Sequence, residues 1–185
     1  MRRRRLGLVA LIAVAAAAGV AVWTVSAEPQ WYQRVRYPLR YESIVVTHAR
    51  NYDLPPTLLA AVIYTESKFD ADARSGAGAV GLMQLLPETA KGIAVRTGGH
   101  RFVVSDLVDP EINVRYGSWY LRNLLNRYDD DVRTALAAYH AGQGNVDEWR
   151  SKGVGIQFPE TRAYVEKVLD AQRVYADAYA DELAG

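Results

Sequence analysis

Apolar residues recur at helical spacing along most of this 185-residue chain, and prolines and glycines mark the breaks between the helical stretches. An amphipathic helix repeats its apolar residues every three to four positions, whereas a half-buried strand alternates strictly. No stretch of this sequence alternates convincingly enough to predict a strand. We therefore predict a mainly α protein, with helices over residues 41–51, 56–69, 87–97, 110–124, 132–139, 145–150 and 159–181.

Size and composition favour a single folded domain behind a short N-terminal region. The chain is 50% hydrophobic and 23% charged, which is typical of a globular protein. A chain of this length ordinarily forms one domain with a sizeable core. We find no internal repeat and no low-complexity run beyond the first 40 residues, so the sequence predicts a linker at residues 28–40 and one domain at residues 41–185.

The first 27 residues indicate export. Four arginines at positions 2–5 precede an uncharged run over residues 6–25, whose 20 residues would rise about 30 Å as a helix, enough to cross a bilayer. Arginines before such a span stay in the cytoplasm, which places the rest of the chain outside. The length favours a membrane anchor, whereas the small residues ending at Ala27 favour a cleaved signal peptide. Both alternatives predict an extracytoplasmic domain, anchored to the cytoplasmic membrane or secreted after cleavage near Ala27.

Charge and residue types exclude several classes of protein and site. Without the four leading arginines, 18 basic residues remain against 21 acidic ones, a net charge of −3 for residues 28–185. A domain with that balance lacks the basic surface that nucleic-acid binding needs. The sequence has no cysteine, which excludes disulfides, thiolate metal sites and a cysteine nucleophile. We predict no metal site and no cofactor.

Glu66 is the strongest candidate for a chemical role. It follows Leu59, Val62 and Ile63 by seven, four and three residues, so it shares the apolar face of the helix predicted at residues 56–69. Burial disfavours the ionised carboxylate and raises its pKa, as a general acid near neutral pH requires. On helix position alone, the alternative is a structural carboxylate that pairs with an arginine or turns to the surface.

Four short motifs follow one another in an informative order. They are Glu-Ser at 66–67; Gly-Leu-Met-Gln at 81–84, preceded by Ala-Arg-Ser-Gly-Ala-Gly-Ala at 73–79; Ala-Tyr-His-Ala-Gly at 138–142; and Glu-Thr-Arg-Ala-Tyr-Val at 160–165. Glycine lets backbone approach a ligand closely, and a glutamine amide can pair with the acetamido and hydroxyl groups of a sugar. Each motif alone is weak. Together, the set resembles the lytic transglycosylases with the soluble-lytic-transglycosylase (SLT) catalytic domain, relatives of goose-type lysozyme in fold, over about residues 41–174.

The resemblance implies a lysozyme-like helical domain that cuts peptidoglycan glycan strands. It implies cleavage of the β-1,4 bond between MurNAc and GlcNAc, with formation of a 1,6-anhydroMurNAc end. Glu66 would protonate the glycosidic oxygen and then take a proton from the C6 hydroxyl, and Tyr139 would hydrogen-bond to Glu66 and orient it. The residues implied in lining the sugar subsites or closing the groove are Ser75, Met83, Gln84, Glu160 and Tyr164.

His140 departs from the family motif, which usually has asparagine at this position. Histidine and asparagine both donate and accept hydrogen bonds, so a structural role survives the replacement. A protonated imidazole, in contrast, would place positive charge near the acid. We keep His140 among the expected substrate-binding residues.

A single carboxylate is consistent with the implied reaction. Ordinary glycosidases use two. The candidates nearest to Glu66 in sequence are Asp70 and Asp72, which fit a polar turn, and Glu88, which fits a helix N-terminus. One carboxylate suffices if the substrate's own acetamido group stabilises the reacting carbon and its C6 hydroxyl replaces water. Two alternatives stay open: a hydrolase of the goose-lysozyme kind, which needs a second acid, and a catalytically silent peptidoglycan-binding scaffold.

The remaining conspicuous side chains are interpreted as structural. Tyr116, Trp119 and Tyr120 recur near helical period, which favours core packing over sugar stacking, and His48 and His100 lack partners at metal-ligand spacing. The predicted partners are therefore peptidoglycan glycan strands and, through residues 6–25, the membrane. We predict no nucleic-acid partner, and the sequence does not identify any envelope protein partner.

Overall fold

The computed structural model describes residues 29–184, and the chain divides into two units, Met1–Arg36 and Tyr37–Gly185. In the first unit the described part holds one short helix, α2 (Gln30–Arg36), which lies within the predicted linker and has no buried residue. The span predicted at residues 6–25 and the cleavage site predicted at Ala27 lie outside the described residues. Among residues 29–184, no helix combines the length and the apolar character that crossing a bilayer requires.

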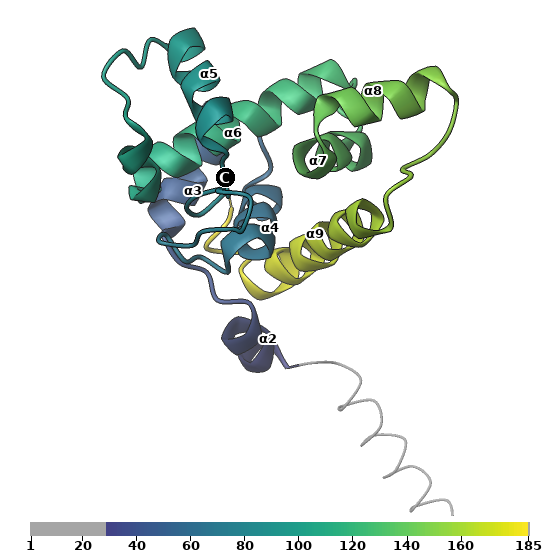
Figure 1. Cartoon of the computed structure of the whole chain (residues 1–185). Coiled ribbons are helices and arrows are strands. Elements are labelled where there is room, and N and C mark those ends of the chain that lie inside the picture. Colours follow the sequence, from purple (N-terminus) through teal and green to yellow (C-terminus); the bar gives the residue numbers. More distant parts are fainter. Residues whose placement is uncertain (1–28, 185) are drawn as a thin grey trace, which may run out of the picture. The chain divides into compact units, whose positions relative to one another are not determined.

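Helices build the second unit, and they confirm the prediction of a mainly α fold (Figure 1). Residues 37–184 contain no strand, only isolated bridges that join Arg74, Val80 and Leu85. The helices are α3 (Glu42–Asn51), α4 (Pro56–Ser67), α5 (Pro87–Thr97), the 3-10 helix η1 (Val104–Val108), α6 (Pro110–Arg127), α7 (Val132–Ala141), α8 (Gln143–Ser151) and α9 (Pro159–Ala178).

Local chemistry sets most of the helix starts. Proline occupies the first turn of α4, α5, α6 and α9, where a missing backbone N–H removes no intrahelical bond. Aspartates cap two helices: Asp109 accepts from the backbone N–H of Ile112 in α6, and Asp131 accepts from the N–H groups of Arg133 and Thr134 in α7. These signals are readable in the sequence, so the predicted starts at 56, 87, 110, 132 and 159 agree with the structure.

The predictions fail mainly at helix ends and in short elements. Helix α4 ends at Ser67, two residues early, because Lys68 and Phe69 adopt left-handed φ angles of 54° and 63°. Helix α8 begins two residues before its predicted start, and α9 ends at Ala178 instead of near residue 181. The 3-10 helix η1 was not predicted, because five residues are too short to show periodicity.

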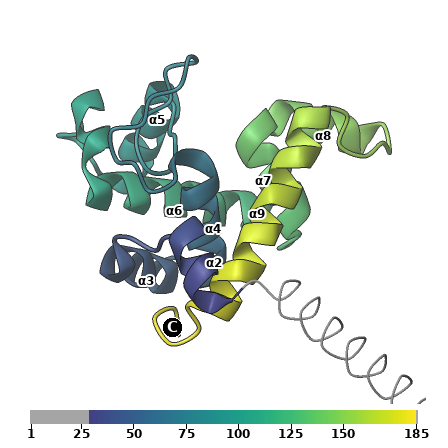
Figure 2. The same ribbon diagram turned by 90° about the horizontal axis from the view of Figure 1, so that it is seen from below.

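Helix α4 is the buried centre of the second unit. All six residues from position 58 to position 63 are buried, so the helix is apolar around its whole circumference there. It packs along α9, and Figures 1 and 2 both show the two helices side by side. A second apolar cluster, under α5 and η1, includes Val80, Leu85, Ile93 and Tyr116. The last turn of α4 therefore carries Glu66 on a helix that the core holds on all sides.

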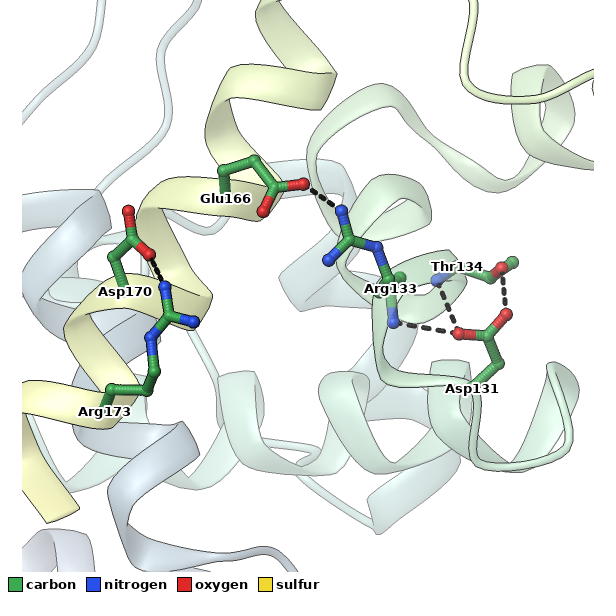
Figure 3. Close-up of polar contacts among 6 residues, drawn as sticks. All are labelled: Asp131, Arg133, Thr134, Glu166, Asp170 and Arg173. Carbon is green, nitrogen blue, oxygen red and sulfur yellow. Dashed lines mark hydrogen bonds and ion pairs between the residues drawn. The ribbon is translucent and has the colours of Figure 1, made fainter.

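The contact between α7 and α9 matters because the candidate site takes residues from both helices. Figure 3 shows an ion pair between Arg133 of α7 and Glu166 of α9, and an i,i+3 pair between Asp170 and Arg173 within α9. All four side chains are solvent-exposed, and exposed pairs contribute only about 0.2–1 kcal/mol. The two helices are therefore positioned chiefly by their buried apolar residues in the main core.

Candidate active site

Glu66 lies at the end of α4, where a hydrogen bond ties the helix to the next loop. The hydroxyl of Ser67 donates to the carbonyl of Leu82 at 2.8 Å, which fastens the Glu-Ser motif to the Gly-Leu-Met-Gln motif. Burial raises the pKa of Glu66 to about 7, and a hydrogen bond from Tyr164 opposes part of that rise. The upward shift predicted from the helix face is confirmed. At neutral pH Glu66 is divided between its protonated and ionised forms.

The hydroxyl group that contacts Glu66 belongs to Tyr164, from α9. Its oxygen lies 2.6 Å from Oε1 of Glu66. Tyr139 was expected to make this bond, and that expectation is wrong: its hydroxyl donates to the carbonyl of Met83 at 2.7 Å. The phenol of Tyr139 has a single proton to donate, and the nearby backbone carbonyl takes it. Tyr139 thus holds the loop beside Glu66, and burial, with a further contribution from the charge of Glu66, raises the pKa of Tyr139.

Asn113, from α6, fixes the loop that follows α4. Its side chain is fully buried and makes three hydrogen bonds, accepting from the N–H of Met83 at 2.8 Å and donating to the carbonyls of Val80 and Leu107 at 2.9 and 2.8 Å. Gly81 has φ +80°, and a Cβ there would lie 2.2 Å from Nδ2 of Asn113. Only glycine permits this close approach of the loop to the asparagine.

The Gly-Leu-Met-Gln motif serves the fold as much as the site. The side chain of Met83 is fully buried and does not line the cavity beside Glu66, so the expected sugar contact through Met83 is not met. Gly117 of α6 makes room for the Met83 side chain, since a Cβ at Gly117 would lie 2.2 Å from the Met83 sulfur. Gln84 does line the cavity, although its amide nitrogen donates to the carbonyls of Ala73 and Gly81 at 3.1 and 3.0 Å.

A cavity of about 470 Å³ opens beside Glu66, a volume in the usual range for ligand sites. Within the described part of the chain, Glu66 is the only acidic residue that lines it. Neither Asp70, Asp72 nor Glu88 is among the lining residues. The cavity brings together five of the predicted site residues, namely Glu66, Ser75, Gln84, Tyr139 and His140.

Two other predicted residues lie behind or beside this cavity. Tyr164 is buried and reaches the site through its hydrogen bond to Glu66, without lining the cavity itself. Glu160 is exposed and does not line it, but its charge acts on His140. The structure therefore supports a contact of Tyr164 with Glu66, and it gives Glu160 only an electrostatic effect on His140.

His140 is part of a connected group of side chains around the acid. Its Nδ1 lies 3.0 Å from the hydroxyl of Thr161, and its ring lies against that of Tyr164, with centroids 4.6 Å apart. Partial burial of the imidazole lowers the pKa of His140, and Glu160 opposes this. The lowered pKa makes the imidazole mainly neutral at neutral pH, so it adds little positive charge beside Glu66.

Sequence reasoning missed three residues of the site. Thr161 is fully buried beside His140; it belongs to the motif at 160–165 but was not singled out, because its partner lies 21 residues earlier in the chain. Tyr120 was interpreted as core, but it lines the cavity and its ring lies 5.4 Å from that of Tyr139. Asn113 carried a signal, because an asparagine on the apolar face of a helix must find buried partners.

Across residues 29–184, no group of three or more histidine, aspartate and glutamate residues is arranged to hold a metal ion. His48, interpreted as structural or surface, is buried and contacts Glu111 at 2.7 Å.

Comparison with protein families decides the membership of this chain. The family described as "Transglycosylase SLT domain" matches residues 43–155. The chain belongs to this family. The SLT-domain residues thus run from α3 to the loop after α8 and include Glu66, the 81–84 loop and His140, whereas Tyr164 of α9 lies beyond the matched stretch.

Several named proteins are similar to this SLT-domain chain. The soluble lytic murein transglycosylase of Salmonella typhimurium is 31% identical over 156 residues, which cover 76% of this chain and 23% of that protein. The transglycosylase of Enterobacteria phage PRD1 is 40% identical over 129 residues, covering 70% of this chain and 41% of the phage protein. The membrane-bound lytic murein transglycosylase F of Desulfosudis oleivorans is 34% identical over 166 residues, covering 84% of this chain and 34% of that protein.

Solved structures share the fold of the SLT-domain chain. An inactive mutant of the lytic transglycosylase Slt from Pseudomonas aeruginosa has a TM-score of 0.75 at 32% identity, over 86% of this chain and 28% of that one. The 70 kDa soluble lytic transglycosylase of Escherichia coli has a TM-score of 0.75 at 28% identity, over 82% of this chain and 26% of that one. These matches confirm the lysozyme-like SLT fold. The chain spans about a quarter of the length of the Salmonella relative and of these structures.

Proposed function

We propose that this protein is a lytic transglycosylase that cuts peptidoglycan glycan strands between MurNAc and GlcNAc. The observation that carries the proposal is Glu66, a carboxylate of pKa about 7 that is the only acidic lining residue of its cavity within the described chain. A group with this pKa can donate and accept a proton near neutral pH, which a two-step acid and base role needs. Relatives named lytic transglycosylases, and the inactive glutamate-to-glutamine mutant of the Pseudomonas enzyme, support the same chemistry.

The reaction uses Glu66 twice. Protonated Glu66 donates its proton to the glycosidic oxygen, the bond from this oxygen to C1 of MurNAc breaks, and the GlcNAc hydroxyl leaves. The acetamido group of MurNAc stabilises the electron-poor C1. The Glu66 carboxylate then takes the proton of the C6 hydroxyl, and O6 bonds to C1, which closes the 1,6-anhydro ring and restores protonated Glu66. No water is consumed. Tyr164 donates to Oε1 of Glu66 and holds the carboxyl group in place between the two steps.

The other cavity residues are proposed to bind the sugars. The hydroxyl of Ser75 accepts from the N–H of Ala79 at 3.0 Å, so its own proton is available to a ligand. Gln84 uses its amide nitrogen on the backbone and can offer its carbonyl oxygen to a sugar hydroxyl or amide. Tyr139 and His140 line the wall that α7 provides, and the charge of the exposed Glu160 acts on His140.

The goose-lysozyme type of hydrolase is the less favoured alternative. It needs a second acid placed to activate water. Glu160 is the nearest candidate by its effect on His140, but it is exposed and does not line the cavity. The silent scaffold is disfavoured because the cavity holds a carboxylate whose pKa is tuned to proton transfer.

Product analysis tests the proposal directly. Purified peptidoglycan is incubated with the full chain in isotopically labelled water, and the products are identified by mass spectrometry. We expect unlabelled products that end in 1,6-anhydroMurNAc. Reducing ends that carry the label would identify a hydrolase, and a folded protein that binds strands without cutting them would identify the scaffold.

We also propose that the domain works outside the cytoplasm, anchored by residues 6–25 or released after cleavage near Ala27. The arginines at positions 2–5 and the following apolar run support this placement, as does similarity to a relative named membrane-bound. Mass determination of the mature N-terminus, after membrane fractionation, distinguishes the anchor from the cleaved signal. The domain bounds of 28–40 and 41–185 stay predictions.

Replacing Tyr164 with phenylalanine should slow the reaction and move its pH profile. The lost hydrogen bond favours ionised Glu66, so its removal raises the pKa of Glu66 above about 7. The first step needs protonated Glu66, so the alkaline limb of kcat/KM should move to higher pH. We expect kcat to fall by about tenfold, as for the loss of one hydrogen bond to a charged group. An unchanged alkaline limb with reduced kcat would show that Tyr164 only packs against the site.

Replacing His140 with asparagine should leave the enzyme active. Asparagine can keep a hydrogen bond to Thr161, although it loses the ring contact with Tyr164. Because His140 is mainly neutral at pH 7 and contributes little charge, we expect kcat/KM there to change by less than about threefold. Below the lowered pKa of His140 only the parent gains a positive charge, so the two profiles should separate on the acid side. A large loss at pH 7 would instead make His140 a direct substrate contact that asparagine cannot replace.

A further inference from the structure

The cavity beside Glu66 continues into a second cavity. This neighbour has a volume of about 590 Å³ and lies between α5, α6 and the start of α8. Both cavities are lined by Thr89 of α5 and by Tyr120 of α6, so they meet at these two side chains. In Figure 1, α5 lies above the left part of α6, and α8 lies near the right-hand end of that helix.

A third cavity, of about 490 Å³, follows the second along α6. The second and third share Trp119, Asn123 and Asn126, and the third reaches the end of α3 at Asn51. We name the second and third cavities together the α6 groove. Counted from Glu66, the three cavities form one connected path that passes over Tyr120 and Trp119.

The α6 groove offers an aromatic ring beside amide groups. Trp119, Asn123 and Asn126 are spaced by four and three residues, so they share one face of α6. Asn123 donates to the backbone carbonyl of Trp119 at 2.9 Å, and both residues line the second and the third cavity. Trp119 packs against the second apolar cluster, as its interpretation as a core residue implies, but it is only partly buried and also lines both cavities. Tyr116, one turn earlier on α6, is the residue that is buried within that cluster.

This combination suits a saccharide. A pyranose ring presents a face of C–H groups that packs against the flat apolar indole, while its rim of hydroxyl and acetamido groups pairs with amides. The substrate of the proposed reaction is a long strand of such rings, and a strand held at Glu66 must leave the first cavity at both ends. The path over Tyr120 and Trp119 is one continuous exit for it.

We propose that the α6 groove is an extended binding site for the glycan strand, with Trp119 as the platform on which a sugar stacks beyond the cutting site. This inference rests on the proposed function. It predicts that the enzyme binds long strands more tightly than short ones, and that Trp119 provides the difference. Trp119 is thus a residue that sets preference for strand length and takes no part in proton transfer.

Strand-length dependence tests this proposal. Uncrosslinked glycan strands of increasing length are titrated against the full chain carrying Glu66→Gln, with and without Trp119→Ala, by calorimetry. We expect Trp119→Ala to weaken binding of long strands about tenfold, equal to ~1.4 kcal/mol, and to leave the shortest strands unaffected. In the active enzyme the same change should raise KM for long strands with kcat unchanged. Tyr41→Ala, an aromatic of which 37% is exposed and which lines none of these cavities, is the matched control and should change neither.

Two further variants separate binding from folding. Trp119→Phe keeps an aromatic platform and should retain most of the length dependence, and Asn126→Ala should weaken long-strand binding about threefold, a loss of ~0.6 kcal/mol, without disturbing the core. Equal binding of long strands by the Trp119→Ala variant and its parent would overturn the inference and leave the proposed function intact. If no Glu66-dependent product forms, the proposed function fails, and the calorimetric comparison still decides whether Trp119 binds glycan.

Discussion

Glu66→Gln should abolish formation of 1,6-anhydroMurNAc products at every pH. Glutamine keeps the size and the polar contacts of the side chain but can neither release a proton to the glycosidic oxygen nor accept one from the C6 hydroxyl. Because the same group acts in both steps, we expect kcat to fall by at least about 1,000-fold. Mass spectrometry of peptidoglycan digests, with the parent chain alongside, measures this loss.

A matched carboxylate distinguishes this loss from a general effect of charge. Asp72 is exposed in the turn that follows α4 and does not line the cavity. It was also one of the candidates for a second acid, so Asp72→Asn tests that reading at the same time. We expect its activity to stay within about twofold of the parent, as for surface changes away from a site. An equal loss of activity in the two variants would mean that removing any carboxylate has this effect and that Glu66 has no particular role in the reaction.

The stability of the Glu66→Gln variant provides an independent check with a defined sign. The pKa of Glu66 is about 7 in the folded state against 4.5 for the unconstrained group, so the folded state binds more protons between these values. Stability of the parent should therefore fall as pH rises from about 4.5 to about 7, whereas glutamine has no such dependence. Thermal unfolding should show the variant gaining stability over the parent across this window and keeping that gain at pH 8. A stability difference between variant and parent that stays constant from pH 4.5 to pH 8 would contradict the burial of Glu66.

The sequence was sufficient to place the acid, because its position depends on local periodicity. Glu66 shares a face with Ile63 and Leu59, and the helix that carries them begins at Pro56, so one element fixes both the acid and its apolar surroundings. The raised pKa follows from this placement. The fold class was equally accessible, since proline and aspartate at the helix starts are local signals.

The partners of the acid could not be read in the same way. Tyr164 lies 98 residues after Glu66, and only the packing of α9 along α4 brings its hydroxyl within 2.6 Å. Tyr139 was equally plausible by type, and what decides between them is a backbone carbonyl, that of Met83, which no residue pattern displays. The exposure of Trp119 depends likewise on how α5 and α8 flank α6.

Asn113→Ala should be the most destabilising single change outside the apolar core. It leaves two carbonyls, of Val80 and Leu107, and the N–H of Met83 buried without their side-chain partner. Each unpaired buried group costs about 1–3 kcal/mol, and relaxation of the loop recovers part of this. We expect the free energy of unfolding in urea to fall by about 3–5 kcal/mol, in the range that marks loss of a buried network.

The effect of Asn113 should also reach Glu66, because the loop that Asn113 anchors supports the candidate site from behind. Leu82 accepts the hydroxyl of Ser67 beside Glu66, and Met83 accepts that of Tyr139. Asn145→Ala is the matched control, since Asn145 makes a single hydrogen bond, to the carbonyl of Ala141 at 2.7 Å, and should lose only about 1 kcal/mol. Under conditions where the Asn113→Ala chain is still folded, its kcat should be lower than that of the Asn145→Ala chain. If the two variants match in both the urea midpoint and kcat, the loop is held by its backbone alone and the buried asparagine does not position the site.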